Sequence, residues 1–343
     1  SVTGMAMDLV DRLFRLILGL VIGYLLFLCC WLWIYCDAFA FRLYSKDKKK
    51  FDRESKLPAD RAAARSVRLC FIRHGESTWN DTFNRSKVPH RFAWRLLSSA
   101  VYETWLIMSG SKDSWFLDSP LSVYGLQQAE ELQAFLRRAA AAPDDPVCED
   151  AKVILGLDEH VHSTVTVSNL RRAVSTCMVG LWDRIQKGND QVLIHSALQE
   201  ISKNPDTLAI TRAGQVPEPS WLDRLHTDTK FAPQMARALD PSCNMGSKPL
   251  SSSGQERLLE FASWASDAAV DRGTVICVGH SFWFREFCRE FMPKNTEHDI
   301  KTKKMTNCGC VMLTLLVDES SGSPEFSVDP DSVKTIYGGY TTK

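Results

Sequence analysis

The chain has 343 residues, enough for about two domains of ordinary size. Hydrophobic residues make up 45% of it and charged residues 24%, a balance that excludes a disordered, collagen-like or disulfide-knot protein. Lysine and arginine together number 41, as do aspartate and glutamate, and a chain without a basic surplus is not expected to bind nucleic acid.

The first predicted element is a transmembrane helix at residues 16–36, after an N-terminal flank at residues 1–15. The segment carries no charge, and a helix of its length spans about 30 Å, the thickness of a bilayer core. Trp31, Trp33 and Tyr35 close it, as aromatic residues do at a membrane interface. A buried core helix is rarely apolar all round for so long, and a cleaved signal peptide ends in small residues, so neither alternative is favoured.

Residues 37–64 are expected to form a basic polar linker. Arg12 and Arg15 precede the apolar segment, whereas seven basic residues follow it between residues 42 and 56. The positive-inside rule therefore places the C-terminal side of the membrane segment in the cytoplasm. The same bases are suited to contact the anionic head groups of the lipid bilayer.

From residue 65 to residue 317, short apolar stretches alternate with helical patterns. Strands are expected at residues 67–72, 153–155, 165–167, 274–278 and 310–317. Helices are expected at residues 125–142, 171–186, 256–270 and 282–291. This alternation predicts an α/β fold, a three-layer α/β/α sandwich in which helices cover both faces of a mostly parallel sheet. Residues 318–343, rich in serine, proline and aspartate, are expected to form a C-terminal tail.

An insert at residues 81–117 interrupts this order with aromatic and basic residues. Within it, apolar residues from Phe92 to Met108 keep the spacing of a helix. An amphipathic helix packed on the core accounts for this pattern. A lid over a binding site, or a surface resting on the membrane beside the anchor, accounts for it as well.

Eleven cysteines follow no disulfide spacing and are expected to be mostly buried free thiols, which favours a reducing compartment for the soluble part. Cys308 and Cys310 have no second pair at the spacing of a zinc site, and His160 and His162 have no matching ligands. No metal site is predicted.

Three of the expected strands end in residues that suit a phosphate group. Residues 73–80 (RHGESTWN) follow the first strand, residues 168–173 (SNLRRA) follow the third, and residues 279–281 (GHS) follow the fourth. Ligands of α/β sheets bind beyond the carboxyl ends of the strands, where helix N-termini add N–H groups for an anion. Two imidazoles and two guanidiniums are therefore expected to converge there and hold a phosphate.

The segment at residues 73–80 resembles the signature of the histidine phosphatase superfamily, also called phosphoglycerate mutase-like. Four further segments resemble motifs of that superfamily in the same order, at residues 118–129, 168–176, 198–200 and 279–281. Together the matches cover about residues 67–317. The resemblance implies the phosphoglycerate mutase-like fold, and phosphoryl chemistry that needs no metal or other cofactor.

The resemblance also implies roles for individual residues. His74 would be the nucleophile that forms a phosphohistidine, with Glu200 as the general acid and base. The residues expected to bind the phosphoryl oxygens are Arg73, Asn80, Arg172 and His280, of which His280 also counts as catalytic. The alternatives by position are Arg171 for Arg172, and Glu76, Glu103 or Asp206 for Glu200.

Two departures from the mutase branch favour a phosphatase. Glu200 is followed by Ile201 and Ser202 in place of a mutase segment of the type E-R-H-Y-G, and the insert replaces the mutase stretch after the first histidine. We therefore expect a membrane-anchored phosphatase that hydrolyses phosphomonoesters, either phosphorylated small molecules or phosphoproteins. A catalytically silent accessory subunit of a membrane assembly, and phosphoryl transfer of the mutase type, are the alternatives.

Overall fold

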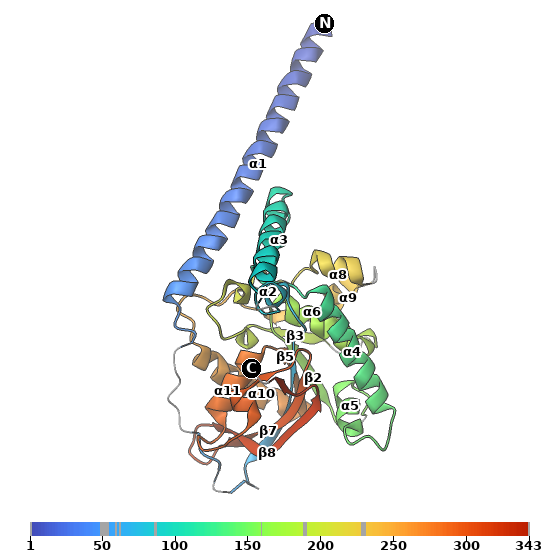
Figure 1. Ribbon diagram of the computed structural model, residues 1–343, viewed down its shortest axis with the longest axis vertical. Coiled ribbons are helices and arrows are strands. Elements are labelled where there is room, and N and C mark those ends of the chain that lie inside the picture. Colours follow the sequence, from blue (N-terminus) through green and yellow to red (C-terminus); the bar gives the residue numbers. More distant parts are fainter. Residues whose placement is uncertain are drawn as a thin grey trace.

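The computed structural model describes residues 2–48, 55–58, 60–61, 63–85, 88–158, 160–187, 191–227 and 231–341, with side chains from residue 11 onward except at 270–272. Three bases of the predicted linker, Lys49, Lys50 and Arg53, lie outside the described residues, as does Lys87 of the insert. The described chain forms a large sheet between helices, and a long N-terminal helix stands out from this body (Figure 1).

Seven strands form the central sheet in the spatial order β4-β3-β2-β5-β1-β7-β8. Their bounds are β1 Arg65–Arg73, β2 Ser163–Val167, β3 Val192–His195, β4 Leu239–Cys243, β5 Thr274–Gly279, β7 Cys310–Asp318 and β8 Glu325–Tyr337. From β4 to β1 all neighbours are parallel, whereas β7 joins β1 and β8 joins β7 in antiparallel pairs. A small second sheet pairs β6 (Lys304–Met305) with β9 (Tyr340–Thr341). The predicted, mostly parallel sheet is confirmed.

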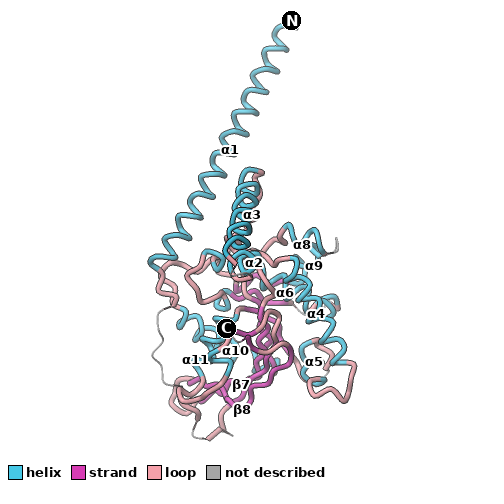
Figure 2. Tube along the Cα trace, in the orientation of Figure 1, coloured by secondary structure: helices cyan, strands magenta, loops and turns pink. Residues whose placement is uncertain are grey.

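Helices cover both faces of the central sheet (Figure 2). Their bounds are α1 Val2–Tyr44, α2 Thr78–Phe83, α3 Pro89–Met108, α4 Val123–Ala140, α5 Cys148–Ile154, α6 Arg171–Gly180, α7 Trp182–Gln186, α8 Trp221–His226, α9 Phe231–Ala238, α10 Gly254–Arg272, α11 Ser281–Phe291 and α12 Asp299–Thr302. Successive side chains of β1 point to opposite faces, so Ile72 packs in one core with α4 and α6, and Phe71 packs in another with α10 and α11. These two cores on one sheet confirm the predicted three-layer sandwich.

Three segments differ from the sequence prediction. Residues 153–155 are not a strand, since Val153 and Ile154 end α5 and Leu155 caps it. So short an apolar run fits a buried helix equally well. The predicted helix at 171–186 is divided into α6 and α7. Residues 318–343 are not a tail, since they contain β8, which pairs with β7 from Asp318 and Glu325 onward. The serine- and proline-rich stretch that resembled a tail is the hairpin loop between these strands.

The helix α1 is longer than the predicted membrane segment at both ends. It runs without a break from Val2 to Tyr44, so the predicted flank and the first part of the predicted linker are helical. The helix is long and apolar enough to cross a membrane, and its apolar stretch is almost wholly exposed. Its last turns pack on the domain, where Trp31, Ala38 and Phe41 share a buried cluster with Leu117. This packing carries the helix past the end of the apolar segment.

The helix predicted within the insert is present as α3, and it lies beside α1 (Figure 1). The Tyr24 hydroxyl donates to the carbonyl oxygen of Met108 at 3.1 Å, and the Tyr35 hydroxyl donates to the Glu103 carboxylate. The residue numbers rise along one helix as they fall along the other, so the two helices are antiparallel. The C-terminal end of α3 therefore lies level with the middle of α1.

Candidate active site

The predicted phosphate-binding segments lie on neighbouring strands. His74 follows β1, His280 follows β5 and Ser168 follows β2, and these three strands are adjacent in the sheet. The backbone N–H of His74 donates to the carbonyl of Gly279 at 2.9 Å, and that of Ser168 donates to the carbonyl of Val278 at 3.0 Å. The carboxyl ends of three parallel strands thus bring the segments together, where ligands of such sheets bind.

His74 is suited to act as a nucleophile through Nε2. Its Nδ1 lies 2.5 Å from the carbonyl oxygen of Gly75, an acceptor, so Nδ1 carries the ring proton. Nε2 then keeps its lone pair, to which Arg172 Nε donates at 3.3 Å. Burial, with the charges of Arg172 and Arg73, holds the pKa of His74 well below its usual value. The imidazole is therefore neutral at physiological pH, as nucleophilic attack requires.

His280 faces His74, with the ring centroids 5.0 Å apart. Its Nε2 lies 2.8 Å from the Ser168 hydroxyl, and its Nδ1 is buried with no hydrogen-bond partner among the described residues. The same holds for Nε of Arg73, whose Nη1 donates to the carbonyl of Met305 at 2.5 Å. Buried polar groups are nearly always paired, so these two nitrogens are suited to the oxygen atoms of a ligand.

Arg172, rather than Arg171, lies at His74. Arg172 is buried, its Nη1 donates to the backbone carbonyl of Asp206 at 2.6 Å, and its Nη2 lies 3.4 Å from the Asp206 carboxylate. Arg171 forms an ion pair with Asp113 instead. Successive helix residues point about 100° apart, so only one of two adjacent arginines can face β1.

Two buried carboxylates lie near Arg172. Glu200 Oε1 accepts from the backbone N–H groups of Ile201 at 3.0 Å and Trp283 at 2.9 Å. Burial raises the pKa of Glu200 above its usual value, although Arg172 opposes the shift. Burial likewise raises the pKa of Asp206, and Oδ1 of Asp206 has no partner within the described ranges. A carboxyl group with a raised pKa is suited to donate a proton, so both residues fit the role of general acid.

The other two alternatives to Glu200 have different partners. Glu76 accepts from the Ser122 hydroxyl at 3.1 Å and lies 3.9 Å from Arg85. Glu103 is buried between α3 and α1, where it accepts from Tyr35. Glu103 therefore joins two helices and is not part of the cluster around His74.

Asn80 is the predicted site residue that the structure does not connect to the cluster. It lies in α2, and its side-chain oxygen accepts from Asn84 Nδ2 at 2.7 Å. No hydrogen bond between Asn80 and His74 occurs in the part of the chain that the structure describes. Its phosphate-binding role stays a prediction.

Two glycines explain why the motifs at residues 73–80 and 118–129 occur together. A Cβ added to Gly75 would lie 2.5 Å from the carbonyl oxygen of Gly125, and one added to Gly125 would overlap the carbonyl oxygen of Glu76. The loop after β1 therefore rests directly on the first turn of α4, which Ser122 caps by accepting from the Gly125 N–H at 3.0 Å. This backbone contact fixes His74 with respect to α4.

Gly125→Ala is expected to lower the free energy of unfolding by about 3 kcal/mol, because the added Cβ meets backbone that cannot turn aside. The corresponding fall in the thermal unfolding midpoint is roughly 6–12 °C. Gly180→Ala is the matched control, since its Cβ would meet Cδ2 of Leu132 at 3.3 Å, the end of a flexible side chain. Thermal unfolding of the full chain in lipid nanodiscs measures both variants. Equal midpoints for the two would contradict the prediction.

A buried ion cluster lies behind Glu200 and includes a residue that follows the end of α1. Lys248 Nζ donates to the backbone carbonyls of Glu200 at 2.5 Å and Ser202 at 2.9 Å. It lies 2.8 Å from the carboxylate of Asp47, which also pairs with Arg257 at 2.6 Å. Burial lowers the pKa of Lys248 to about 8. Lys248 and Arg257 thus hold the backbone that carries Glu200, and their shared counter-ion is Asp47, which follows α1.

Sequence reasoning missed Asp47 and Lys248. Asp47 stands in the run KDKKK at residues 46–50, which indicates a solvated linker, yet its side chain is fully buried. Lys248 lies in a stretch without periodicity. The one available signal was a single acid inside a basic run, and it gave no hint of which cations it pairs with.

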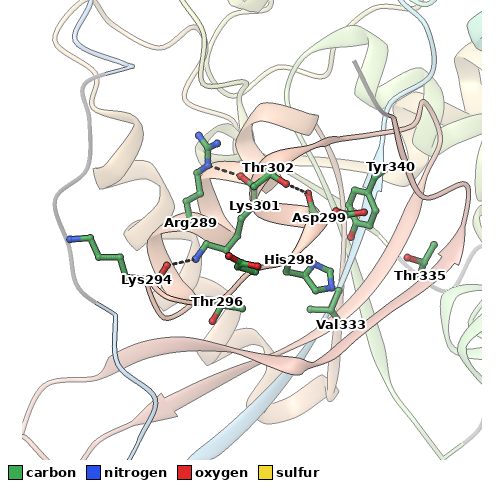
Figure 3. Close-up of a pocket in the computed structure, with 11 residues that line it drawn as sticks. Arg289, Lys294, Thr296, His298, Asp299, Lys301, Thr302, Val333, Thr335 and Tyr340 are labelled. Carbon is green, nitrogen blue, oxygen red and sulfur yellow. Dashed lines mark hydrogen bonds between the residues drawn. The ribbon is translucent and has the colours of Figure 1, made fainter.

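A separate surface pocket of about 970 Å³ lies between α11, α12, β8 and β9 (Figure 3). No predicted site residue is among the described residues that line it. Its bases are engaged within the protein, since Lys301 Nζ donates to the carbonyl of Pro293 at 2.8 Å and Arg289 Nε to that of Lys301 at 2.7 Å. Within the described ranges, no three metal-ligating side chains gather there or elsewhere. The candidate active site is therefore the cluster around His74.

No family model and no curated protein matches the chain. Among solved structures, a mycobacterial glucosyl-3-phosphoglycerate phosphatase is 16% identical over 77% of this chain and 98% of its own, with a TM-score of 0.36. A variant of phosphoserine phosphatase from Entamoeba histolytica is 16% identical over 77% and 96%, with a TM-score of 0.33. The phosphoglycerate mutase from Bacillus anthracis is 16% identical over 73% and 88%, with a TM-score of 0.36. These three neighbours are two phosphatases and a phosphoglycerate mutase.

Proposed function

We propose that the protein is a membrane-anchored phosphatase that hydrolyses phosphomonoesters through a phosphohistidine intermediate. The observation that carries the proposal is the geometry of His74, whose Nδ1 is engaged by Gly75 and whose Nε2 lone pair faces a buried arginine. A neutral imidazole with an unprotonated nitrogen beside fixed positive charge is what attack on a phosphoryl group needs.

The proposed reaction has two steps. Nε2 of His74 attacks phosphorus, the bond from phosphorus to the ester oxygen breaks, and Glu200 gives its proton to the departing oxygen. A water molecule then attacks the phosphohistidine and gives a proton to Glu200, which releases inorganic phosphate and restores both residues. Arg73, Arg172 and His280 would stabilise the charge that develops on the phosphoryl oxygens in each step.

The anchoring and the substrate are the finer part of the proposal. α1 would span the bilayer, and the excess of basic residues after its apolar segment supports a catalytic domain in the cytoplasm. The substrate is a phosphorylated small molecule or a phosphoprotein, and a domain held at the lipid surface favours substrates that are themselves bound to the membrane.

A quenched-flow experiment tests the proposed chemistry. The full chain in lipid nanodiscs is mixed with a radiolabelled aryl phosphate in heavy-oxygen water and quenched with alkali. The expected result is a label that is stable in alkali and lost in acid, as for a phosphohistidine, with one heavy oxygen in the released phosphate. A folded protein with neither label nor turnover would favour the silent accessory subunit. Transfer to an added alcohol in place of water would favour a mutase-type transferase.

Glu200→Gln is expected to lower kcat/KM for an alkyl phosphate by about 10²–10⁴-fold, and far less for p-nitrophenyl phosphate, whose leaving group departs without a proton. Because burial raises the pKa of Glu200, its acid form persists above the usual range, and the alkyl rate should fall as pH rises through that pKa. The variant should lack this fall. Asp206→Asn is the matched control. If only that variant loses more rate with the alkyl phosphate than with p-nitrophenyl phosphate, the general acid is Asp206.

A further inference from the structure

The helix α3 carries an apolar stripe on its outward face. The stripe consists of Trp94, Leu97, Val101, Trp105 and Met108, which recur every three or four residues and so share one side of the helix. These side chains are between 58% and 70% exposed. Monomeric soluble proteins rarely expose contiguous apolar patches of this kind, so the stripe calls for a partner.

The side of α3 that faces the protein carries two polar side chains together with Leu106. Ser99 and Glu103 are buried, where Ser99 bonds to the Thr82 hydroxyl at 2.9 Å and Glu103 accepts from Ser114 at 2.7 Å. A helix on the surface of a soluble domain has the opposite arrangement, with its apolar side inward. Most of the large apolar side chains of α3 thus lie on its outer side, as on a helix whose outer surroundings are apolar.

The level of α3 along α1 indicates what those surroundings are. Met108 lies at Tyr24 and Glu103 at Tyr35, both within the charge-free segment at residues 16–36. Tyr24 is about 18 Å along the helix from the end of that segment, at 1.5 Å per residue. The C-terminal half of α3 is therefore level with the part of α1 whose own apolar side chains are exposed.

We propose that the outward stripe of α3 is inserted among the lipids of the leaflet nearer the catalytic domain, with phospholipid acyl chains as its partner. The proposal rests on the membrane anchoring in the proposed function. Its basis is the shared level of the two helices, because the exposed apolar stripe of α3 lies beside the exposed apolar stretch of α1. Indole side chains favour the membrane interface, and Trp94 and Trp105 lie at two levels of the stripe.

The same position disfavours a protein partner. A second copy or a soluble protein would have to enter the layer that surrounds α1 in order to cover Val101 and Met108. Lipid fills that layer wherever α1 spans a bilayer. Of the open alternatives for the insert, the structure thus favours a surface in contact with the membrane.

Photo-cross-linking of the full chain tests the proposal. A benzophenone amino acid replaces Val101 in α3, Leu26 in α1, or Leu157, which is exposed in the segment after α5. The helix α5 lies apart from α1 and α3 (Figure 1). Each variant is placed in phosphatidylcholine nanodiscs and irradiated, and mass spectrometry counts the lipid adducts. Because all three side chains are exposed, folding is not at risk, and the thermal midpoint of each variant verifies this.

We expect adducts at position 101 at a level close to that at position 26 and several-fold above that at position 157. If position 26 forms lipid adducts but position 101 forms no more than position 157, the insertion of α3 is overturned and the anchoring by α1 is left intact. A cross-link from 101 to a second copy of the chain would overturn it in favour of a protein interface. If positions 26 and 101 both form no more lipid adducts than position 157, the insertion of α3 and the membrane anchoring are overturned together. Phosphatase activity is a separate measurement, so none of these results depends on the catalytic part of the proposed function.

Discussion

His74→Ala is expected to lower kcat/KM for p-nitrophenyl phosphate by about four orders of magnitude or more, and to abolish the acid-labile label. His280 is the neighbouring imidazole, and it is suited to bind a phosphoryl oxygen through Nδ1, since its Nε2 is engaged by Ser168 at 2.8 Å. Binding of inorganic phosphate should persist, since Arg73 and Arg172 remain. Steady-state rates of the full chain in nanodiscs, with phosphate binding by calorimetry, measure both effects.

The control for this variant is His226→Ala. His226 is exposed at the end of α8 and should tolerate the change without loss of rate. A His74→Ala protein that keeps more than a tenth of the activity would show that phosphorus is attacked by another group, and the two-step reaction would have to be abandoned.

Asp47→Asn is expected to lower the free energy of unfolding by about 3–5 kcal/mol, the usual cost of leaving a buried charge without its partner. Lys248 and Arg257 both pair with this carboxylate, and all three side chains are buried. Lys248 also holds the backbone carbonyls of Glu200 and Ser202. We therefore expect a fall in kcat for alkyl phosphates in addition to the loss of stability.

Thermal unfolding and kcat of the full chain measure the two consequences of Asp47→Asn. Asp37→Asn is the matched control, because Asp37 is an exposed carboxylate in α1, ten residues before Asp47. If both variants unfold at the same temperature, the carboxylate of Asp47 does not stabilise the cation pair. If Asp47→Asn is less stable but hydrolyses alkyl phosphates at the normal rate, the cluster supports the fold without positioning Glu200.

The centre of the fold was predictable because its signals are local. β1, β2 and β5 are apolar runs that end in polar motifs, and each motif begins where its strand stops. Parallel pairing then brings His74, Ser168 and His280 to one edge without any further information. The choice of Arg172 over Arg171 also followed from motif spacing, and the structure places Arg172 at His74.

The parts that were not predictable depend on contacts distant in sequence. Residues 153–155 carry an apolar signal too short to distinguish strand from helix. The strand β8 is recognisable only through its pairing with β7, since few of its residues are strongly apolar. Asp47 is separated from Lys248 by two hundred residues of chain, and nothing near either one indicates the other.

With α1 across a bilayer, as proposed, the continuity of the helix from Val2 to Tyr44 and the burial of Asp47 shortly after it determine how membrane thickness would act on this protein. A transmembrane helix that is longer than the local hydrocarbon layer tilts until its apolar length fits. Where a flexible linker follows the helix, the linker does not transmit that tilt to the domain. Here the helix is packed on the domain through Trp31 and Phe41. A change in the tilt of the helix would therefore rotate the whole domain relative to the membrane. Bilayers of different thickness would then present His74 to the lipid surface at different angles, which makes the composition of the membrane a determinant of access.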